Sequence, residues 1–231
     1  MANVFLETAQ HLKKVAEQQT AILVAFSGGK DSRAVLDLCC HAFQTVVCFH
    51  MYFVPGLRCI DEQLAIAKER YHCEIVWVPH WTLSRCLRNG IFCPNYFNRD
   101  DMPEWKLADV HRIVREDTGI YPIAHGGKLT DSLWRRRQLG NKKKFAGSGR
   151  SDTEGVIYPI KEWSKYDVLA YLAKQKIPVP EGDSESNSGV DLATPSILWL
   201  HDKYPDDFAR MEKVFPYISA VVARRTLYGV K

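Results

Sequence analysis

Several features are missing from this sequence of 231 residues. No apolar run approaches the length that crosses a bilayer, so we expect no membrane segment and no membrane partner. The first residues, Met1 to Glu7, contain neither a basic region nor a long apolar run, and we therefore expect no signal peptide. No internal repeat and no low-complexity tract is present. These absences predict a cytoplasmic protein.

A strong excess of one charge is also missing. The 31 Lys and Arg against 27 Asp and Glu leave a net charge of +4, which favours a polyanionic ligand but is too small to establish nucleic-acid binding. The seven cysteines are an odd number in a chain without export signals, so we expect reduced thiols. A hydrophobic content of 46% predicts a globular fold with a true core.

Apolar runs alternate with amphipathic stretches along most of the chain. This pattern predicts an α/β fold, a mostly parallel five-stranded sheet with helices on both faces, Rossmann-like, followed by a short helical C-terminal region. Ligands of such sheets bind at the carboxyl ends of the strands, so Gly28, Tyr52, Gly56 and Pro79 should surround one site. We expect strands at 21–26, 45–52, 73–78, 120–124 and 156–160, and helices at 4–19, up to 43, 60–71, 82–88, 105–118 and 164–174.

One stretch organises the rest. The apolar strand 21–26 runs into Ser27-Gly28-Gly29-Lys30-Asp31-Ser32, and a helix follows at once. Glycines between a strand and a helix N-terminus let an anion approach the backbone N–H groups, which is the geometry of a phosphate site. We expect Asp31 or Ser32 to cap the helix, Lys30 to add a cation, and Ser27 and Ser32 to add hydroxyl donors.

A second dense stretch follows the fourth predicted strand. It begins with His125-Gly126-Gly127-Lys128 and continues through Asp131-Ser132 to the basic runs Arg135–Arg137 and Lys142–Lys144. Successive residues of a helix diverge by about 100°, so at most two of the three arginines can face a site. We expect these to be Arg135 and Arg136.

Three stretches resemble one family. Ser27–Ser32 resembles the SGGxDS loop of the N-type ATP pyrophosphatase (PP-loop) superfamily. Gly126–Ser132 with Arg135 and Arg136 resembles the glycine–basic–acidic segment of phosphoadenosine phosphosulfate (PAPS) reductases, and Tyr158–Val168 resembles the start of a helix in that family. The resemblance covers roughly residues 20–180. It implies an adenine nucleotide alpha hydrolase-like fold, with a PP-loop domain at 1–180 and a helical extension at 181–231.

The resemblance also implies roles for individual residues. Lys30, Lys128 and Arg135 would be catalytic, by stabilising the charge that grows on a pyrophosphate leaving group, and Asp31 would hold Mg²⁺. The implied nucleotide-binding residues are Ser27, Gly28, Gly29, Lys30, Asp31, Ser32, Tyr52, Gly126, Gly127, Lys128, Arg135 and Arg136.

The activity that these residues favour is an ATP pyrophosphatase reaction with adenylyl transfer, after which the activated atom could receive sulfur. An alternative is reduction of PAPS or APS; the reductases use a cysteine near the C-terminus, whereas the last cysteine here is Cys93. Cys59, Cys86 or Cys93 would have to replace it. A further alternative is an accessory subunit without turnover that binds a nucleotide or nucleic acid.

The expected ligands and partners follow from these alternatives. They are ATP, PAPS or APS, Mg²⁺, a sulfur-donor protein, DNA or tRNA, and a second copy of the chain in a homo-oligomer. The pair Cys39-Cys40 resembles part of an iron–sulfur motif, but its Cys-x-x-Cys partner is missing and we expect no cluster.

Overall fold

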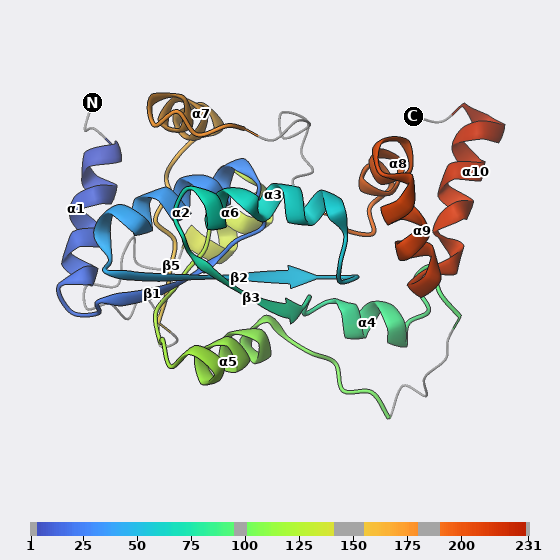
Figure 1. The fold of residues 1–231 in the computed structure, drawn as a ribbon, viewed down its shortest axis with the longest axis horizontal. Coiled ribbons are helices and arrows are strands. Elements are labelled where there is room, and N and C mark those ends of the chain that lie inside the picture. Colours follow the sequence, from blue (N-terminus) through green and yellow to red (C-terminus); the bar gives the residue numbers. More distant parts are fainter. Residues whose placement is uncertain (1–3, 95–100, 141–154, 180–189, 230–231) are drawn as a thin grey trace.

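The computed structural model describes residues 4–94, 101–140, 155–179 and 190–229. Five parallel strands form one sheet in the order β3-β2-β1-β4-β5, with β1 at its centre (Figure 1). The predicted fold class is confirmed. The strands are β1 (Ala21–Ala25), β2 (Thr45–Tyr52), β3 (Glu74–Pro79), β4 (Ile123–Ala124) and β5 (Val156–Ile157).

The helices follow the amphipathic stretches. They are α1 (Val4–Ala16), α2 (Lys30–Ala42), α3 (Arg58–Glu69), α4 (Leu83–Arg88), α5 (Leu107–Thr118), α6 (Leu133–Gly140), α7 (Lys165–Lys174), α8 (Thr194–Lys203), α9 (Pro205–Val214), the short 3₁₀ helix η2 (Pro216–Ile218) and α10 (Ser219–Tyr228). None of these described helices combines the length and the apolar character that crossing a membrane requires.

The strand order reverses beside β1. The chain first extends the sheet on one side, where Ala21 pairs with Thr45, and then returns to the other side, where Leu23 pairs with Ile123. Neighbouring loops diverge at such a reversal and leave a crevice at the carboxyl ends of the strands. The loops after β1 and β4 therefore lie at the position where this fold class binds ligands.

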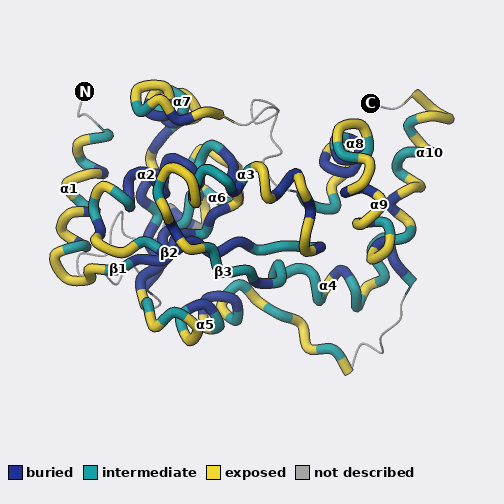
Figure 2. Tube along the Cα trace, in the orientation of Figure 1, coloured by how far each residue is buried: buried dark blue, intermediate teal, exposed yellow. Residues whose placement is uncertain are grey.

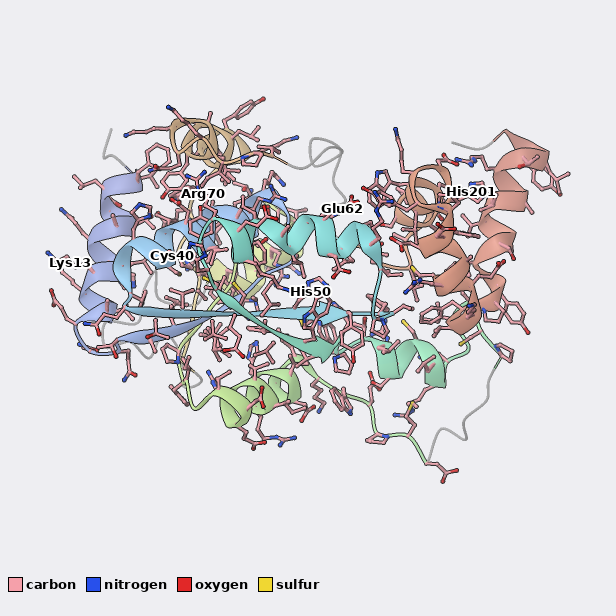
Figure 3. All side chains as sticks on the ribbon, in the orientation of Figure 1. Lys13, Cys40, His50, Glu62, Arg70 and His201 are labelled. Atoms are coloured by element: carbon pink, nitrogen blue, oxygen red, sulfur yellow. The ribbon has the colours of Figure 1, made fainter. Side chains whose placement is uncertain are left out.

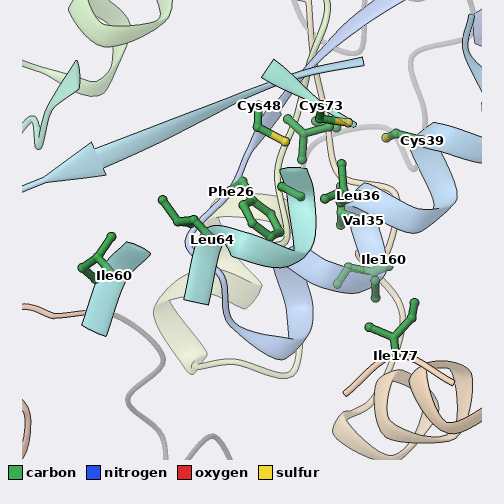
Figure 4. Packing of buried hydrophobic residues seen from close by; sticks show 14 of the residues in the cluster. Phe26, Val35, Leu36, Cys39, Cys48, Ile60, Leu64, Cys73, Ile160 and Ile177 are labelled. Atoms are coloured by element: carbon green, nitrogen blue, oxygen red, sulfur yellow. The ribbon is translucent and has the colours of Figure 1, made fainter. Parts of the chain in front are cut away.

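The two faces of the sheet pack different cores, because strand side chains alternate in direction. Ile22, Val24 and Phe26 belong to the cluster that includes residues of α1, α2, α3 and α7, while Leu23 packs with Val110 and other residues of the α5 side. Figure 4 shows part of the first cluster, and Figure 2 shows buried residues in the middle of β1 and of β2.

The C-terminal helices α8 to α10 lie together beyond the carboxyl end of β2 (Figure 1). A buried carboxylate joins them to α3: Asp207 of α9 accepts hydrogen bonds from the backbone N–H groups of Arg58 (2.9 Å) and Cys59 (2.8 Å). Arg210 donates to the carbonyl oxygen of Gly56 at 2.8 Å. The extension thereby supplies the N-terminal cap of a helix in the α/β part.

Some predicted boundaries were wrong. The strands predicted at 120–124 and 156–160 contain only two residues each, since Pro122 has no N–H to donate before β4 and Pro159 follows β5. The capping box at the start of α7 is confirmed, with Ser164 and Asp167 bonded reciprocally. Lys142–Lys144 and the expected domain boundary at residues 180 and 181 lie outside the described residues.

Candidate functional site

The loop after β1 has a backbone that only glycine supports at one position. Gly28 has φ = +82°, and a Cβ atom there would lie 2.8 Å from Cβ of Gln63 in α3. A side chain at residue 28 would therefore be disfavoured by both its backbone angle and the neighbouring helix. The glycine lets the loop lie directly against α3.

Helix α2 begins at Lys30, so its N-cap position lies two residues before Asp31 and three before Ser32. Gly29 is the N-cap residue and makes no side-chain cap, so the expectation that Asp31 or Ser32 caps the helix was wrong. The first N–H groups of a helix have no partner within the helix, and they carry the positive end of the helix dipole. Without a capping side chain, these donors are available to an anion.

Hydrogen bonds within the loop fix its shape. Ser32 donates to the carbonyl oxygen of Gly29 (2.9 Å), Ser27 donates to the hydroxyl of Ser32 (3.2 Å), and the N–H of Gly29 reaches the hydroxyl of Ser27 (3.4 Å). The buried Arg33 donates through Nε to the carbonyl oxygen of Gly28 at 2.6 Å. The hydroxyls of Ser27 and Ser32 thus form hydrogen bonds within the loop, and these bonds fix its shape without a ligand.

The glycines after β4 pack against this loop. A Cβ atom on Gly126 would lie 3.4 Å from the backbone carbon and the Cβ of Asp31, and one on Gly127 would lie 3.4 Å from the ring of Tyr158. Small residues here allow the second loop to approach the start of α2. Two glycine-containing loops, which the sequence separates by about a hundred residues, therefore meet at the reversal of the strand order.

Lys128 lies in a place that the sequence did not indicate. Its side chain is only 3% exposed, and its Nζ lies 2.8 Å from Oδ2 of Asp31 and 2.8 Å from Oδ1 of Asp131. Lys30 also approaches Oδ2 of Asp31, at 3.2 Å. The other oxygen, Oδ1 of Asp31, is buried and has no hydrogen-bond partner among the described residues. Lys128 thus holds two carboxylates at the edge of the loop.

A pocket of about 390 Å³ lies between the two loops and the ends of β1 and β2. Eight of the predicted nucleotide-binding residues line it: Ser27, Gly29, Asp31, Ser32, Tyr52, Gly126, Gly127 and Arg135. Gly28, Lys30, Lys128 and Arg136 are not in its wall, and neither are Gly56 and Pro79, which were expected around the site. Arg135 reaches it from α6, whereas Arg136 is exposed, as the divergence of neighbouring helical residues requires.

The far wall of the pocket is aromatic. Phe53 and His80 stack with their ring centres 4.7 Å apart and their planes at 18°, and Tyr52 lies beside them on β2. Burial lowers the pKa of His80 to about 4, so its ring is neutral near pH 7. These residues offer flat surfaces to a ring system in the same pocket as the loop that offers donors to an anion.

Two further histidines lie at the strand ends. Nδ1 of the buried His50 lies 3.0 Å from the carbonyl oxygen of Phe26, and burial lowers the pKa of its imidazole (Figure 3). His125 lines the pocket, and its Nε2 lies 2.9 Å from Nε2 of His111 in α5, so one ring must donate to the other. Both strand-end histidines are therefore engaged with the protein scaffold.

The cysteines that the sequence offered to the site are elsewhere. Cys59, Cys86 and Cys93 are buried, and none of them belongs to the described wall of the pocket. Burial raises the pKa of all three thiols. Among the described residues, no group of three or more His, Cys, Asp or Glu side chains is arranged to hold a metal ion.

Asp131 and Gln63 are two further residues of the site to which the sequence analysis gave no role. Asp131 lines the pocket and pairs with Lys128 three residues before it, a spacing that could have indicated the contact. Gln63 supports Gly28 from the middle of α3, and no local pattern marks it.

Comparisons with known proteins address the fold. No family model matches the sequence, and no curated protein matches it. A PAPS reductase from Candida auris, solved as a phosphate complex, is similar at a TM-score of 0.50 and 13% identity, over 75% of this chain and 82% of that one. An NH₃-dependent NAD synthetase from Campylobacter jejuni reaches 0.52 and 10%, over 99% and 95%. The chain has the adenine nucleotide alpha hydrolase-like fold.

The similarity extends to a third structure. It is the U34-tRNA thiolase NcsA from Methanococcus maripaludis with its [4Fe-4S] cluster, at a TM-score of 0.49 and 17% identity, over 99% of this chain and 81% of that one. In the adenine nucleotide alpha hydrolase-like fold of the present chain, the described pocket lies at the carboxyl ends of the central strands, as the fold class predicts.

Proposed function

We propose that the protein binds ATP in the pocket and transfers its adenylyl group to an acceptor with release of pyrophosphate. The observation that carries this proposal is the meeting of the two glycine-containing loops at the uncapped N-terminus of α2, with Arg135 in the same wall. Together they would surround one anionic group with backbone N–H donors and a guanidinium. The fold shared with an NAD synthetase and a PAPS reductase supports a nucleotide ligand.

The aromatic wall would receive the adenine. Tyr52, Phe53 and His80 form the aromatic part of the pocket wall, whereas Arg135 is a charged part of it. A purine can stack on aromatic surfaces of this kind. The phosphates would then extend toward Ser27–Ser32. This orientation assigns the apolar and the anionic parts of the nucleotide to matching parts of one pocket.

The reaction that follows is an in-line displacement. An acceptor oxygen attacks the α-phosphorus, a new phosphorus–oxygen bond forms, and the bond from that phosphorus to the α,β-bridging oxygen breaks, so that pyrophosphate leaves with the electron pair. The N–H groups at the start of α2 and the guanidinium of Arg135 would stabilise the leaving charge. Asp31 fits Mg²⁺ binding because its buried Oδ1 has no described partner, and Mg²⁺ would neutralise phosphate oxygens when bound.

Lys128 receives a different role in this proposal from the one its position in the sequence suggested. Its ammonium group is buried between Asp31 and Asp131, so it would position these carboxylates and would not contact phosphate itself. The proposal stops at adenylyl transfer. Sulfur transfer or PAPS reduction would need a thiol at the pocket, and the described wall contains none.

Two measurements test the proposal. The first is calorimetric binding of α,β-methylene-ATP with Mg²⁺ to the wild type, Arg135→Ala and the exposed control Lys174→Ala. Loss of a charge-assisted hydrogen bond costs roughly 1.5–3 kcal/mol, so Arg135→Ala should weaken binding by about 10-fold to 100-fold and the control should not. Equal affinity of all three proteins would contradict the assigned pocket.

The second measurement identifies the products. The protein is incubated with ATP, Mg²⁺ and candidate acceptors, and pyrophosphate with an adenylylated acceptor or AMP is expected. ADP with phosphate would overturn the proposed reaction while leaving the binding site intact. Tighter binding of PAPS than of the ATP analogue would favour the sulfonucleotide alternative, and salt-sensitive RNA or DNA binding without nucleotide turnover would favour the accessory subunit.

A further inference from the structure

Four of the seven cysteines gather at one place away from the pocket. Cys39 and Cys40 lie near the end of α2, Cys48 lies in β2, and Cys73 lies just before β3. Figure 4 shows Cys39, Cys48 and Cys73 at one end of the hydrophobic cluster, and Figure 3 labels Cys40 on α2. None of the four belongs to the described wall of the pocket, so the proposed reaction gives these cysteines no role.

Two of the four thiols are already neighbours. Sγ of Cys40 lies 3.8 Å from Sγ of Cys73. A disulfide bond needs ~2.05 Å between its sulfur atoms, so a small movement of the two side chains would bring them together. Cys40 is half-buried and Cys73 is 7% exposed, whereas Cys39 and Cys48 are fully enclosed. An oxidant can therefore reach the Cys40–Cys73 pair more easily than the other two thiols.

The turn that carries Cys73 is fixed against α2. Tyr71 donates its hydroxyl to Oδ1 of the buried Asp37, one turn before Cys40, at 2.7 Å. The backbone N–H of Cys73 donates to the carbonyl oxygen of Ala67 at 2.9 Å, which ties the turn to the end of α3. Because both segments are anchored, the two sulfur atoms stay close without a covalent bond.

The surroundings also favour a thiolate at Cys73. Hydrogen bonds from the thiols of Cys40 and Cys48 lower the pKa of Cys73, and His72 acts in the same direction, while burial opposes them. As a thiol, Cys73 can instead donate to the carbonyl oxygen of Tyr71, but that contact is long at 3.7 Å. The thiolate is the form that reacts with oxidants.

We propose that Cys40 and Cys73 form a reversible disulfide bond when the protein meets a peroxide. The Cys73 sulfur attacks the peroxide and becomes a sulfenic acid, with loss of water or an alcohol. The Cys40 thiol then attacks that sulfur, the sulfur–sulfur bond forms, and a second water leaves. In total two thiols lose two protons and two electrons, and one peroxide is reduced. The bond links α2, which begins at the phosphate loop, to the turn before β3.

The test oxidises the native protein. The folded protein is treated with hydrogen peroxide, the peroxide is removed, and the protein is then unfolded, alkylated with N-ethylmaleimide, and examined by intact mass and peptide mapping. We expect the number of alkylated cysteines to fall from seven to five, with Cys40 and Cys73 in one cross-linked peptide that dithiothreitol separates. Alkylation of all seven after peroxide, or a cross-link between other cysteines, would overturn the proposal.

Matched variants sharpen the result. Cys40→Ser should abolish the cross-link, and so should Cys73→Ser. Cys86→Ser, which removes a buried thiol outside this group of four cysteines, should leave the cross-link unchanged. If Cys73→Ser does not fold, Cys40→Ser at the half-buried position still decides the question. A cross-link that appears only in urea would show that the native structure does not pair these thiols, and would also overturn the proposal.

Discussion

Nζ of Lys128 lies 2.8 Å from Oδ2 of Asp31, so the cation that follows β4 is neutralised by the phosphate loop's own carboxylate. A second carboxylate, that of Asp131, lies equally close to the same nitrogen atom. A buried ammonium group must have such partners, because its transfer from water is otherwise very costly. The contact joins the two loops of the pocket and makes Lys128 part of the scaffold that holds Asp31.

The first prediction concerns this buried cation. In Lys128→Met, Asp131 would lose its cation and Asp31 would keep only Lys30, at 3.2 Å. The free energy of unfolding in urea should fall by about 3 kcal/mol, at the low end for a broken buried ion pair because both carboxylates stay partly exposed. The control Lys174→Met should change it by less than about 0.5 kcal/mol. Unchanged stability with lost nucleotide affinity would instead make Lys128 a direct ligand of the phosphates.

The second prediction compares two glycines with positive φ. In Gly28→Ala the new Cβ would meet Cβ of Gln63 at 2.8 Å, whereas in Gly119→Ala nothing lies within 4 Å. Both substitutions carry a backbone cost of about 1–2 kcal/mol, but only the first must also displace the loop. We expect Gly28→Ala to weaken binding of α,β-methylene-ATP more than 10-fold, and Gly119→Ala to lower the melting temperature without changing affinity. Similar affinities would show that the loop tolerates displacement.

Local patterns predicted the frame of this molecule. Five of the six apolar residues before Ser27 form β1, because a continuous apolar run suits a strand that is covered on both faces. The boundaries of β2 were predicted to the residue, and the capping box of Ser164 and Asp167 sets the start of α7. In each case the signal lies within a few neighbouring residues, so the sequence alone carries it.

The parts that the sequence did not predict depend on contacts between distant residues. Lys128 looked like a cation for phosphate because its partner Asp31 is almost a hundred positions away. Gly28 needs to be glycine because the loop lies against Gln63, which is about 35 positions away in the sequence. Periodicity and composition report the environment of a residue, but they do not identify its partner across the fold.

The third prediction concerns the cap that the C-terminal helices supply. In Asp207→Asn one carboxylate oxygen is replaced by an amide that cannot accept from Arg58 or Cys59, so α3 should lose about 1–2 kcal/mol of stabilisation. Because Gln63 of α3 supports Gly28, nucleotide affinity should also fall. The exposed neighbour offers the control: Asp206→Asn should leave both quantities nearly unchanged in urea unfolding and calorimetry. Equal effects of the two variants would show that the cap does not stabilise α3.

The fourth prediction concerns acid sensitivity at the aromatic wall. Burial lowers the pKa of His80 from about 6.5 to about 4. Between these pH values the imidazole of His80 is protonated in the unfolded chain but remains neutral in the folded chain. The contribution of His80 to stability is therefore present above pH 6.5 and is lost as the pH falls toward 4. The short contact of its Nδ1 with the hydroxyl of Thr82, at 2.7 Å, and the Thr82 N–H at 3.2 Å suit the neutral ring.

His80→Asn removes this titration and keeps an acceptor for the N–H of Thr82. The free energy of unfolding, measured in urea at half-unit steps from pH 7.5 to pH 4, should decline less steeply in the variant than in the wild type. Burial lowers the pKa values of His11 and His50 in the same direction, and both remain in the variant, so part of the acid sensitivity should persist. Parallel pH curves for the two proteins would mean that His80 accepts a proton in the folded state as readily as in the unfolded one. The wall beside Phe53 would then be open to water, and a purine could not stack there against a neutral ring.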